Sequence, residues 1–317
     1  MKQFWISAGL MLAWVALPTA ANAQTAPPHQ PMGPPIHVNV RLVNVFVNVT
    51  DANGAPVPGL TVKDFALSEE GRPQKISYFE RETNVPLSIV MAIDTSGSTR
   101  KDIPVEKDAA REFARALLRP ADRLDLMDFN SDVREVVPFT CNVRLIDAGL
   151  NHLDFGPATA LYEAVYLASQ RLQPRHGRKV LLLISDGGNT KYEVDYGQAL
   201  EAARQGDVMV YSIIDLPIVA DAGRDTDGEH AMISLAEETG GQYFYANANN
   251  LRQVFQKVLD NLRTQYLLGY YPNPPARGSR FRKISVKLTY APKINGPYTV
   301  QNRTGYYPAG DSDQPSQ

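Results

Sequence analysis

The chain has 317 residues, of which 44% are apolar and 21% are charged, and its formal net charge is -2. This length allows one large domain or two ordinary ones, and the apolar content supports a hydrophobic core, which excludes a chain that is disordered throughout. The near-neutral charge argues against a protein whose main task is to coat DNA or an anionic membrane. The single cysteine, Cys141, excludes an intrachain disulfide bond and a cysteine-based metal site, and we expect it to be a buried, unreactive thiol near a strand end.

Residues 1–23 have the three parts of a secretory signal peptide. A basic start at Lys2 precedes an apolar run from Phe4 to Leu17, and Ala21-Asn22-Ala23 supplies the small residues that signal peptidase requires. The run is shorter than the ~20 apolar residues that cross a bilayer, which favours cleavage over an uncleaved anchor. We therefore expect a secreted or periplasmic protein with no transmembrane segment. Residues 24–35 contain five prolines and are predicted to be an extended linker.

Short strands are predicted in residues 36–83. Branched apolar side chains recur at every second position in residues 36–49, and turn signals follow at residues 51–54 and 70–71. This part of the chain is expected to form four or five strands.

Buried strands alternate with helices in residues 84–263. Nearly continuous apolar runs, typical of strands buried on both faces of a parallel sheet, occupy residues 87–93, 124–129, 180–184, 208–214 and, more briefly, 243–245. Helices are predicted between and after them, at residues 104–118, 143–151, 160–173, 196–205, 230–239 and 249–263. The alternation predicts a doubly wound α/β domain.

The chain returns to a β pattern in residues 264–308, and residues 309–317 are predicted to be a disordered tail. Strands are expected at residues 266–271, 282–290 and 298–300. A few strands on their own make a marginal domain. We therefore expect residues 36–83 and 264–308 to form one β-sandwich into which the α/β domain is inserted.

Oxygen-bearing side chains follow three parts of the predicted α/β domain. Asp94, Ser96 and Ser98 stand at alternate positions after the first strand, Thr159 lies just before a helix, and Asp186 ends another strand. The carboxyl ends of strands form the ligand crevice of open α/β sheets. Carboxylate and hydroxyl oxygens without nitrogen or sulfur suit a hard cation, Mg²⁺ first and then Mn²⁺ or Ca²⁺. Each segment alone is also explained by a helix cap or a turn, but the three together favour a metal site.

These residues resemble the metal-ion-dependent adhesion site of the von Willebrand factor type A domain. The segment Asp94-Thr-Ser-Gly-Ser98, with Thr159 and Asp186, fills the five expected positions, and the resemblance covers about residues 86–263. The flanks also resemble secreted bacterial, especially acidobacterial, proteins related to this family, in the segments Val49-Thr-Asp-Ala-Asn-Gly54, Gly59-Leu-Thr-Val-Lys-Asp-Phe65, Tyr266-Leu-Leu-Gly-Tyr270 and Gly305-Tyr-Tyr307. The resemblance implies a six-stranded, mostly parallel sheet with an antiparallel edge strand at about residues 134–139. It also implies a bound divalent ion that accepts an Asp or Glu carboxylate from a protein partner.

The sequence alone does not exclude two other functions. A phosphatase-like, metal-dependent hydrolase also needs an Asp at a strand end, but aspartyl-phosphate enzymes need a second acid two residues later, where this chain has Ser96. A basic, aromatic stretch near the C-terminal end, with Arg280, Arg282, Lys283 and Lys287, would suit an anionic glycan or nucleic acid, although its period of two also fits a core face and a solvated face. We expect an exported, non-enzymatic, cation-dependent adhesion or protein-binding module that does not bind nucleic acid.

Overall fold

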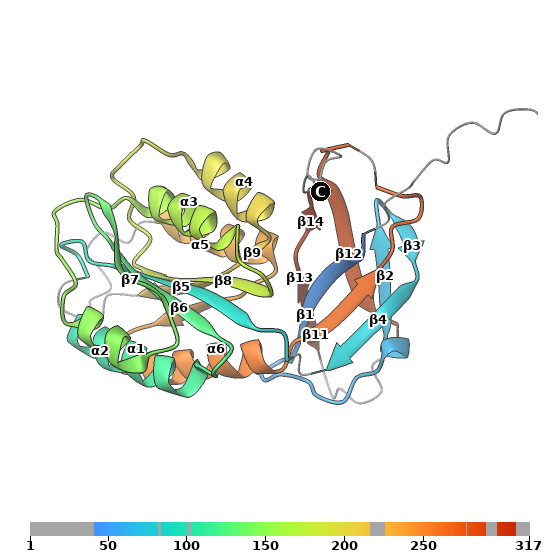
Figure 1. Cartoon of the computed structure of the whole chain (residues 1–317), viewed down its shortest axis with the longest axis horizontal. Coiled ribbons are helices and arrows are strands. Elements are labelled where there is room, and N and C mark those ends of the chain that lie inside the picture. Colours follow the sequence, from blue (N-terminus) through green and yellow to red (C-terminus); the bar gives the residue numbers. More distant parts are fainter. Residues whose placement is uncertain are drawn as a thin grey trace, which may run out of the picture. The chain divides into compact units, whose positions relative to one another are not determined.

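The computed structural model describes residues 41–81, 84–99, 103–215, 226–276, 278–289 and 297–308. These residues form one six-stranded sheet and two four-stranded sheets (Figure 1). The predicted signal peptide, linker and C-terminal tail lie outside the described residues. Within those ranges, no helix combines the length and the apolar character needed to cross a bilayer.

The six-stranded sheet comes from the middle of the chain and has the strand order β10-β9-β8-β5-β6-β7. Its strands are β5 (Leu87–Asp94), β6 (Arg123–Phe129), β7 (Val133–Thr140), β8 (Arg178–Ser185), β9 (Val208–Asp215) and β10 (Tyr243–Ala246). The edge strand β7 is antiparallel to β6, and the other neighbouring pairs are parallel. Strands β5 and β9 are buried along their whole length, as their continuous apolar runs predict. The predicted α/β class and the antiparallel edge strand are confirmed.

Helices cover both faces of this sheet (Figure 1). One face packs against α1 (Ile103–Leu117), α2 (Val143–Leu150) and α6 (Leu251–Arg263). The other packs against α3 (Leu161–Leu172), α4 (Tyr196–Gly206) and α5 (Thr226–Thr239). All six helices were predicted, but α5 begins four residues before the expected start at residue 230. The glycine in this first turn has a packing reason, because a Cβ at Gly228 would overlap the backbone of Gly187.

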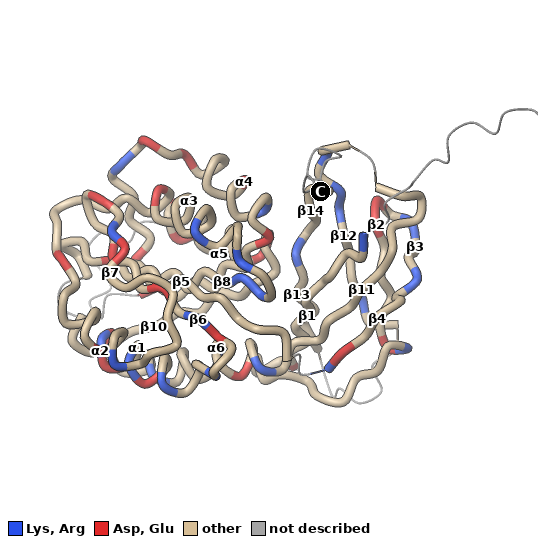
Figure 2. Tube along the Cα trace, viewed as in Figure 1, with Lys and Arg blue, Asp and Glu red and all other residues tan. Residues whose placement is uncertain are grey.

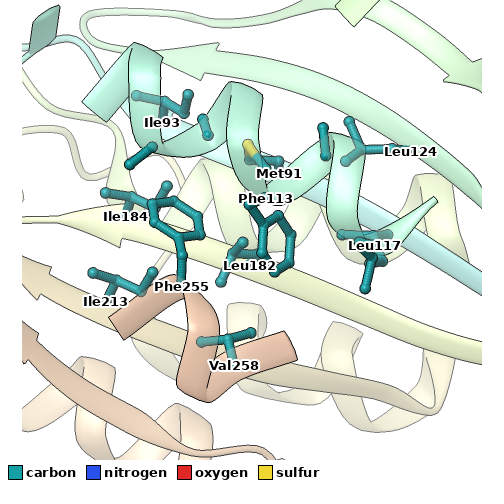
Figure 3. Packing of buried hydrophobic residues seen from close by; sticks show 14 of the residues in the cluster. Met91, Ile93, Phe113, Leu117, Leu124, Leu182, Ile184, Ile213, Phe255 and Val258 are labelled. Carbon is teal, nitrogen blue, oxygen red and sulfur yellow. The ribbon is translucent and has the colours of Figure 1, made fainter. Parts of the chain in front are cut away.

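The core beneath α1 and α6 is closely packed (Figure 3). Phe113 of α1 and Phe255 of α6 meet with their ring centroids 5.1 Å apart. Both rings belong to the same buried cluster as Met91 and Ile93 of β5 and Leu182 of β8. Aromatic pairs of this kind contribute about 0.5–1.5 kcal/mol beyond the apolar area that they bury. The pair therefore holds the last helix of the α/β part against the central strands.

The two four-stranded sheets face each other across a shared core. Their orders are β13-β1-β11-β4 and β14-β12-β2-β3, and all their neighbouring strands are antiparallel. Each sheet combines strands from before and after the α/β part: β1 (Val43–Asp51), β2 (Phe65–Glu69), β3 (Arg72–Gln74) and β4 (Ile76–Arg81), and then β11 (Tyr266–Tyr270), β12 (Arg282–Leu288), β13 (Tyr298–Asn302) and β14 (Gly305–Tyr306). A short 3₁₀ turn, η1 (Val62–Asp64), precedes β2. The predicted insertion of an α/β fold between two β flanks is confirmed.

The β flanks contact the amino-terminal edge of the six-stranded sheet. The backbone N–H of Thr304 donates to the carbonyl of Glu238 at 3.2 Å, and the Thr304 hydroxyl donates to the same oxygen at 2.9 Å. Arg303 pairs with Asp207, which lies just before β9. Among the described residues, these contacts lie at the edge opposite to the carboxyl ends of the parallel strands.

The sequence-based expectation for Cys141 is wrong. This residue follows the last residue of β7, as expected, but its side chain is exposed rather than buried. The antiparallel edge strand β7 is only partly covered, so its end projects into solvent. Exposure alone gives this thiol no role.

The basic strand β12 has the alternation of a half-buried strand. Ile284 and Val286 point into the sandwich core, whereas Lys283 and Lys287 are exposed. Figure 2 shows the basic residues along β12. Three aromatic side chains of the same half, Tyr266, Tyr270 and Tyr306, are at most 8% exposed. Because buried rings are not free to stack on a base or a sugar, this pattern favours a core face and a solvated face.

Candidate metal site

The site lies where the strand order of the six-stranded sheet reverses. The chain proceeds from β5 to β6 and β7 on one side and then returns to β8 on the other side of β5. Such a switch point opens a crevice at the carboxyl ends of the two central strands. Asp94 is the last residue of β5, and Asp186 directly follows Ser185, the last residue of β8.

Asp94 is buried and held at both of its carboxylate oxygens. The side chain accepts a hydrogen bond from the backbone N–H of Ser96 at 2.9 Å and another from the hydroxyl of Ser185 at 2.6 Å. Asp94 is 1% exposed. The Thr99 hydroxyl donates to the carbonyl oxygens of Asp94 and Ser96, at 3.0 and 3.2 Å. These bonds fix the loop that follows β5 and hold the Asp94 carboxylate in one orientation.

Ser96 and Ser98 bring two hydroxyls together in this loop. Their Oγ atoms are 3.1 Å apart, and Ser96 is buried whereas Ser98 is exposed. The described part of helix α1 begins at Ile103, five residues after Ser98.

Thr159 and Asp186 approach each other at a glycine. A Cβ placed on Gly188 would lie 3.3 Å from Asp186 Oδ1 and 3.9 Å from Thr159 Oγ1. The N-cap of α3 is Ala160, and Thr159, which is 5% exposed, makes no cap. Asp186 Oδ1 also accepts the backbone N–H of Gly188 at 3.0 Å, so the turn interpretation of Asp186 holds beside the functional one. Both side chains thus lie around one small space beside Gly188.

The loops that carry Thr159 and Asp186 are joined by hydrogen bonds from both backbone and side-chain groups. The Thr159 N–H donates to the Thr190 hydroxyl at 2.8 Å, and the Thr159 carbonyl accepts the Thr190 N–H at 2.9 Å. The side chain of Asn189 accepts the N–H of Leu161 at 3.0 Å. Thr190 and Asn189 were not expected from the sequence, where their only signal is that they follow Asp186 closely.

The electrostatic balance of the site is negative. Among the described residues, no Lys, Arg or His pairs with Asp94 or Asp186. Burial, with a smaller contribution from the charge of Asp186, raises the pKa of Asp94 to about 6, against the lowering effect of the hydrogen bonds from Ser185 and Ser96. A buried carboxylate without a countercharge is unfavourable, and such groups gather at functional sites.

A family comparison identifies this part of the chain. Residues 89–189 match the sequence model of the von Willebrand factor type A domain. Residues 89–189 therefore belong to a von Willebrand factor type A domain. The matched stretch contains all five predicted ligand positions, from Asp94 to Asp186.

Solved structures are similar to this chain at low sequence identity. Proximal thread matrix protein 1 from the mussel byssus is 12% identical to the chain and gives a TM-score of 0.50. The matched region covers 62% of this chain and 51% of the mussel protein. A second structure of that mussel protein, with a zinc-occupied MIDAS motif, is 13% identical, with coverages of 58% and 47% and a TM-score of 0.47. The vWF domain of the type V pili tip protein Mfa5 from Porphyromonas gingivalis is 13% identical, with coverages of 62% and 99% and a TM-score of 0.43. No curated protein sequence matches the chain.

The donor set of this type A domain fits a hard divalent cation. It consists of two carboxylates and three hydroxyls, which are Asp94, Asp186, Ser96, Ser98 and Thr159. Hydroxyl and carboxylate oxygens are the ligands that Mg²⁺ takes, usually together with water. In the part of the chain that the structure describes, no group of three or more His, Cys, Asp or Glu side chains is placed to hold a metal. A site at this edge would therefore depend on the hydroxyls as well as on the two acids.

Proposed function

We propose that the chain is an exported, divalent-cation-dependent protein-binding or adhesion module. Its metal ligands are Asp94, Ser96, Ser98, Thr159 and Asp186, directly or through water, and Mg²⁺ is the first candidate ion, before Mn²⁺ and Ca²⁺. The observation that carries this proposal is the buried carboxylate of Asp94, which is exposed to the charge of Asp186 and has no basic partner among the described residues. A bound cation would offset the unfavourable burial of this charge.

The residues of the site have distinct tasks. Asp94 and Asp186 supply charge, and the hydrogen bonds from Ser185 and Ser96 hold the Asp94 carboxylate in one orientation. Ser96, Ser98 and Thr159 supply neutral oxygens, which offset less of an ion's charge than carboxylates do. A divalent ion at this site would accept a carboxylate oxygen from an Asp or Glu of a partner protein.

Two of the five proposed ligands are accessible within the described ranges. Ser98 is exposed and Asp186 is half-buried, whereas Asp94, Ser96 and Thr159 lie deeper. The described residues of the β flanks contact the opposite edge of the sheet, at Asp207 and Glu238. This arrangement supports binding of a large partner rather than enclosure of a small substrate.

A carboxylate probe tests this function without knowledge of the natural partner. Purified protein loaded with Mn²⁺ is titrated with acetate while the relaxation of water protons is measured. We expect the relaxation enhancement to fall as acetate displaces a water from the bound ion, and Asp186→Ala to abolish the enhancement. Asp195→Ala is the matched control, because Asp195 lies in the same loop but caps α4 by accepting the N–H of Gln198 at 2.8 Å. Enhancement that acetate leaves unchanged would contradict partner binding through the metal.

The proposal excludes catalysis. Ser96 stands at the position where aspartyl-phosphate enzymes place their second acid, and it donates or accepts a hydrogen bond with Ser98 instead. We expect no hydrolysis of p-nitrophenyl phosphate by the Mg²⁺-loaded protein. Hydrolysis that Asp94→Ala abolishes would replace the binding function with a hydrolase function.

Export is part of the proposal and depends on residues 1–23, which have the composition of a signal peptide. The mass of the protein recovered from a secreting host tests it. Cleavage after Ala23 is expected, and an intact N-terminal segment in the recovered protein would contradict export by this route.

A further inference from the structure

We propose that Asn130 is a positioning residue for the metal site, because it joins the loop that carries Ser96 and Ser98 to the loop that carries Thr159. This inference rests on the proposed function, since it assigns to Asn130 control of the affinity of that same site for the cation. Asn130 is the first residue after β6 and is not one of the five predicted ligands.

The side chain of Asn130 touches both loops. Its Nδ2 donates to Thr95 Oγ1 at 3.2 Å and to the carbonyl oxygen of Asp154 at 3.2 Å. Thr95 stands between Asp94 and Ser96, and Asp154 lies in the segment that leads to Thr159. Its Oδ1 accepts the backbone N–H of Ser131 at 2.6 Å, which fixes the direction of the amide. One amide group therefore bonds to the Thr95 side chain, to the backbone of Asp154 and to the backbone of its own neighbour Ser131.

Backbone contacts of the same residue reinforce this connection. The carbonyl of Asn130 accepts the N–H of Ala160, the neighbour of Thr159, at 2.7 Å. Gly156 packs directly on the Asn130 side chain, where a Cβ would overlap the amide group. The N–H of Gly156 also donates to the carbonyl of Thr95 at 3.3 Å. The Thr159 loop thus contacts Asn130 and Thr95 both before Thr159, at Gly156, and after it, at Ala160.

An asparagine suits this position for chemical reasons. A short side chain must donate two hydrogen bonds and accept one, which a primary amide does. Aspartate would keep the acceptor but lose both donations, and serine has a single donor. Groups that orient metal ligands without touching the ion change metal affinity by about 10–100-fold when they are removed.

The Thr159 loop has a second anchor, so the loss of Asn130 should displace it rather than unfold it. Asp128, which is 1% exposed, accepts the N–H of Asp154 at 2.8 Å and pairs with Arg134. Arg134 donates to the carbonyl of His152 at 2.7 Å. These bonds hold the start of the loop, whereas Asn130 acts between residues 154 and 160. A change at Asn130 is therefore expected to reach the site through the position of Thr159.

Calorimetric titration of the purified protein with MgCl₂ and with MnCl₂ tests this inference. We expect Asn130→Ala to weaken metal binding by about 10-fold. The control is Asn142→Ala, since Asn142 is a capping asparagine that accepts the N–H of Arg144 at 3.0 Å at the start of α2. Loss of a cap lowers the stability of a protein by about 1 kcal/mol, so this control is destabilised, and its metal affinity should match that of the wild type.

A second variant distinguishes positioning from general destabilisation. Thr95→Val keeps the shape of the side chain and removes the acceptor for Asn130 Nδ2. We expect this variant to bind metal less tightly than the wild type does. The double variant should bind metal as tightly as the single variant with the lower affinity, because both changes break the same connection. Equal metal affinity of the wild type and Asn130→Ala, or independent effects of the two changes, would overturn the inference. Absence of metal binding by the wild type would instead overturn the proposed function.

Discussion

Replacement of Asp94 with asparagine should stabilise the protein in EDTA at neutral pH, although it removes a metal ligand. The asparagine side chain would keep the oxygen that accepts the N–H of Ser96, now at 2.9 Å from Asp94. Its amide would donate to the Ser185 hydroxyl, which at present donates to Asp94 at 2.6 Å and accepts the N–H of Gly187 at 3.1 Å. A hydroxyl accepts two hydrogen bonds, so this reversal is possible without movement of the backbone.

The magnitude follows from the pKa of Asp94. Burial raises this pKa from 3.8 to about 6, so the folded protein favours the protonated acid. Without metal, the contribution of Asp94 to the stability of the wild type is therefore most favourable below pH 4, becomes less favourable as the pH rises to about 6, and stays unfavourable above it. A difference of about two pH units corresponds to about 3 kcal/mol, and Asp94→Asn removes this penalty. At pH 4 the advantage of the variant should fall below about 1 kcal/mol.

Urea denaturation in EDTA at pH 4 and at pH 7.5 measures this effect. The variant should be more stable than the wild type at pH 7.5 and nearly equal to it at pH 4. In Mg²⁺ the order should reverse, because a ligand at 100 times its Kd stabilises the wild type by about 2.7 kcal/mol. A variant that is less stable than the wild type in EDTA at both pH values would refute the reasoning from burial of the charge.

Three further changes test the fold and the loops around the site. Phe255→Ala removes a ring from the core between α1 and α6 and should lower the free energy of unfolding by about 3–5 kcal/mol in urea denaturation, with unchanged secondary structure by circular dichroism. Tyr211→Phe removes a buried hydroxyl that accepts from Asn48 at 3.0 Å and from Gln265 at 3.2 Å, and should cost about 2 kcal/mol in the same assay without any change in the calorimetric affinity for Mg²⁺. Gly187→Ala places a side chain where φ is 93° and should cost about 1–3 kcal/mol and also weaken Mg²⁺ binding, because the strain falls in the loop of Asp186. A fully stable Phe255→Ala, a reduced Mg²⁺ affinity in Tyr211→Phe or an unchanged affinity in Gly187→Ala would each contradict these expectations.

Local sequence patterns predicted the α/β architecture, because a strand that is buried on both faces of a sheet has a continuous run of apolar residues. The continuous apolar run at residues 87–93 corresponds to β5, whose residues Leu87–Asp94 are all buried. The start of α5 was missed, because Asp227 and Gly228 have low helix propensity and are typical of a loop. The structure keeps the glycine inside the helix because the backbone of Gly187 leaves no room for a side chain. Contact with a distant segment outweighs local propensity there.

The candidate ligands were predictable from spacing, but the residues that hold them were not. Asp94, Ser96 and Ser98 form a local pattern that a single segment displays. Ser185 and Asn130 act through hydrogen bonds to residues 91 and 35 positions away in the sequence, and no local signal marks such partners. The same limit explains Cys141, whose exposure depends on how the end of the edge strand β7 is covered.

The most direct test of the central claim is a titration with Mn²⁺ followed by electron paramagnetic resonance, which counts free ions. The wild type should bind a single Mn²⁺ ion that excess Mg²⁺ displaces, and a variant with both Asp94→Ala and Asp186→Ala should bind none while its circular dichroism spectrum stays that of the wild type. Asp195→Ala, an acid of the same loop that caps α4, should bind as the wild type does. Undiminished Mn²⁺ binding by the folded double variant would contradict the assignment of the site.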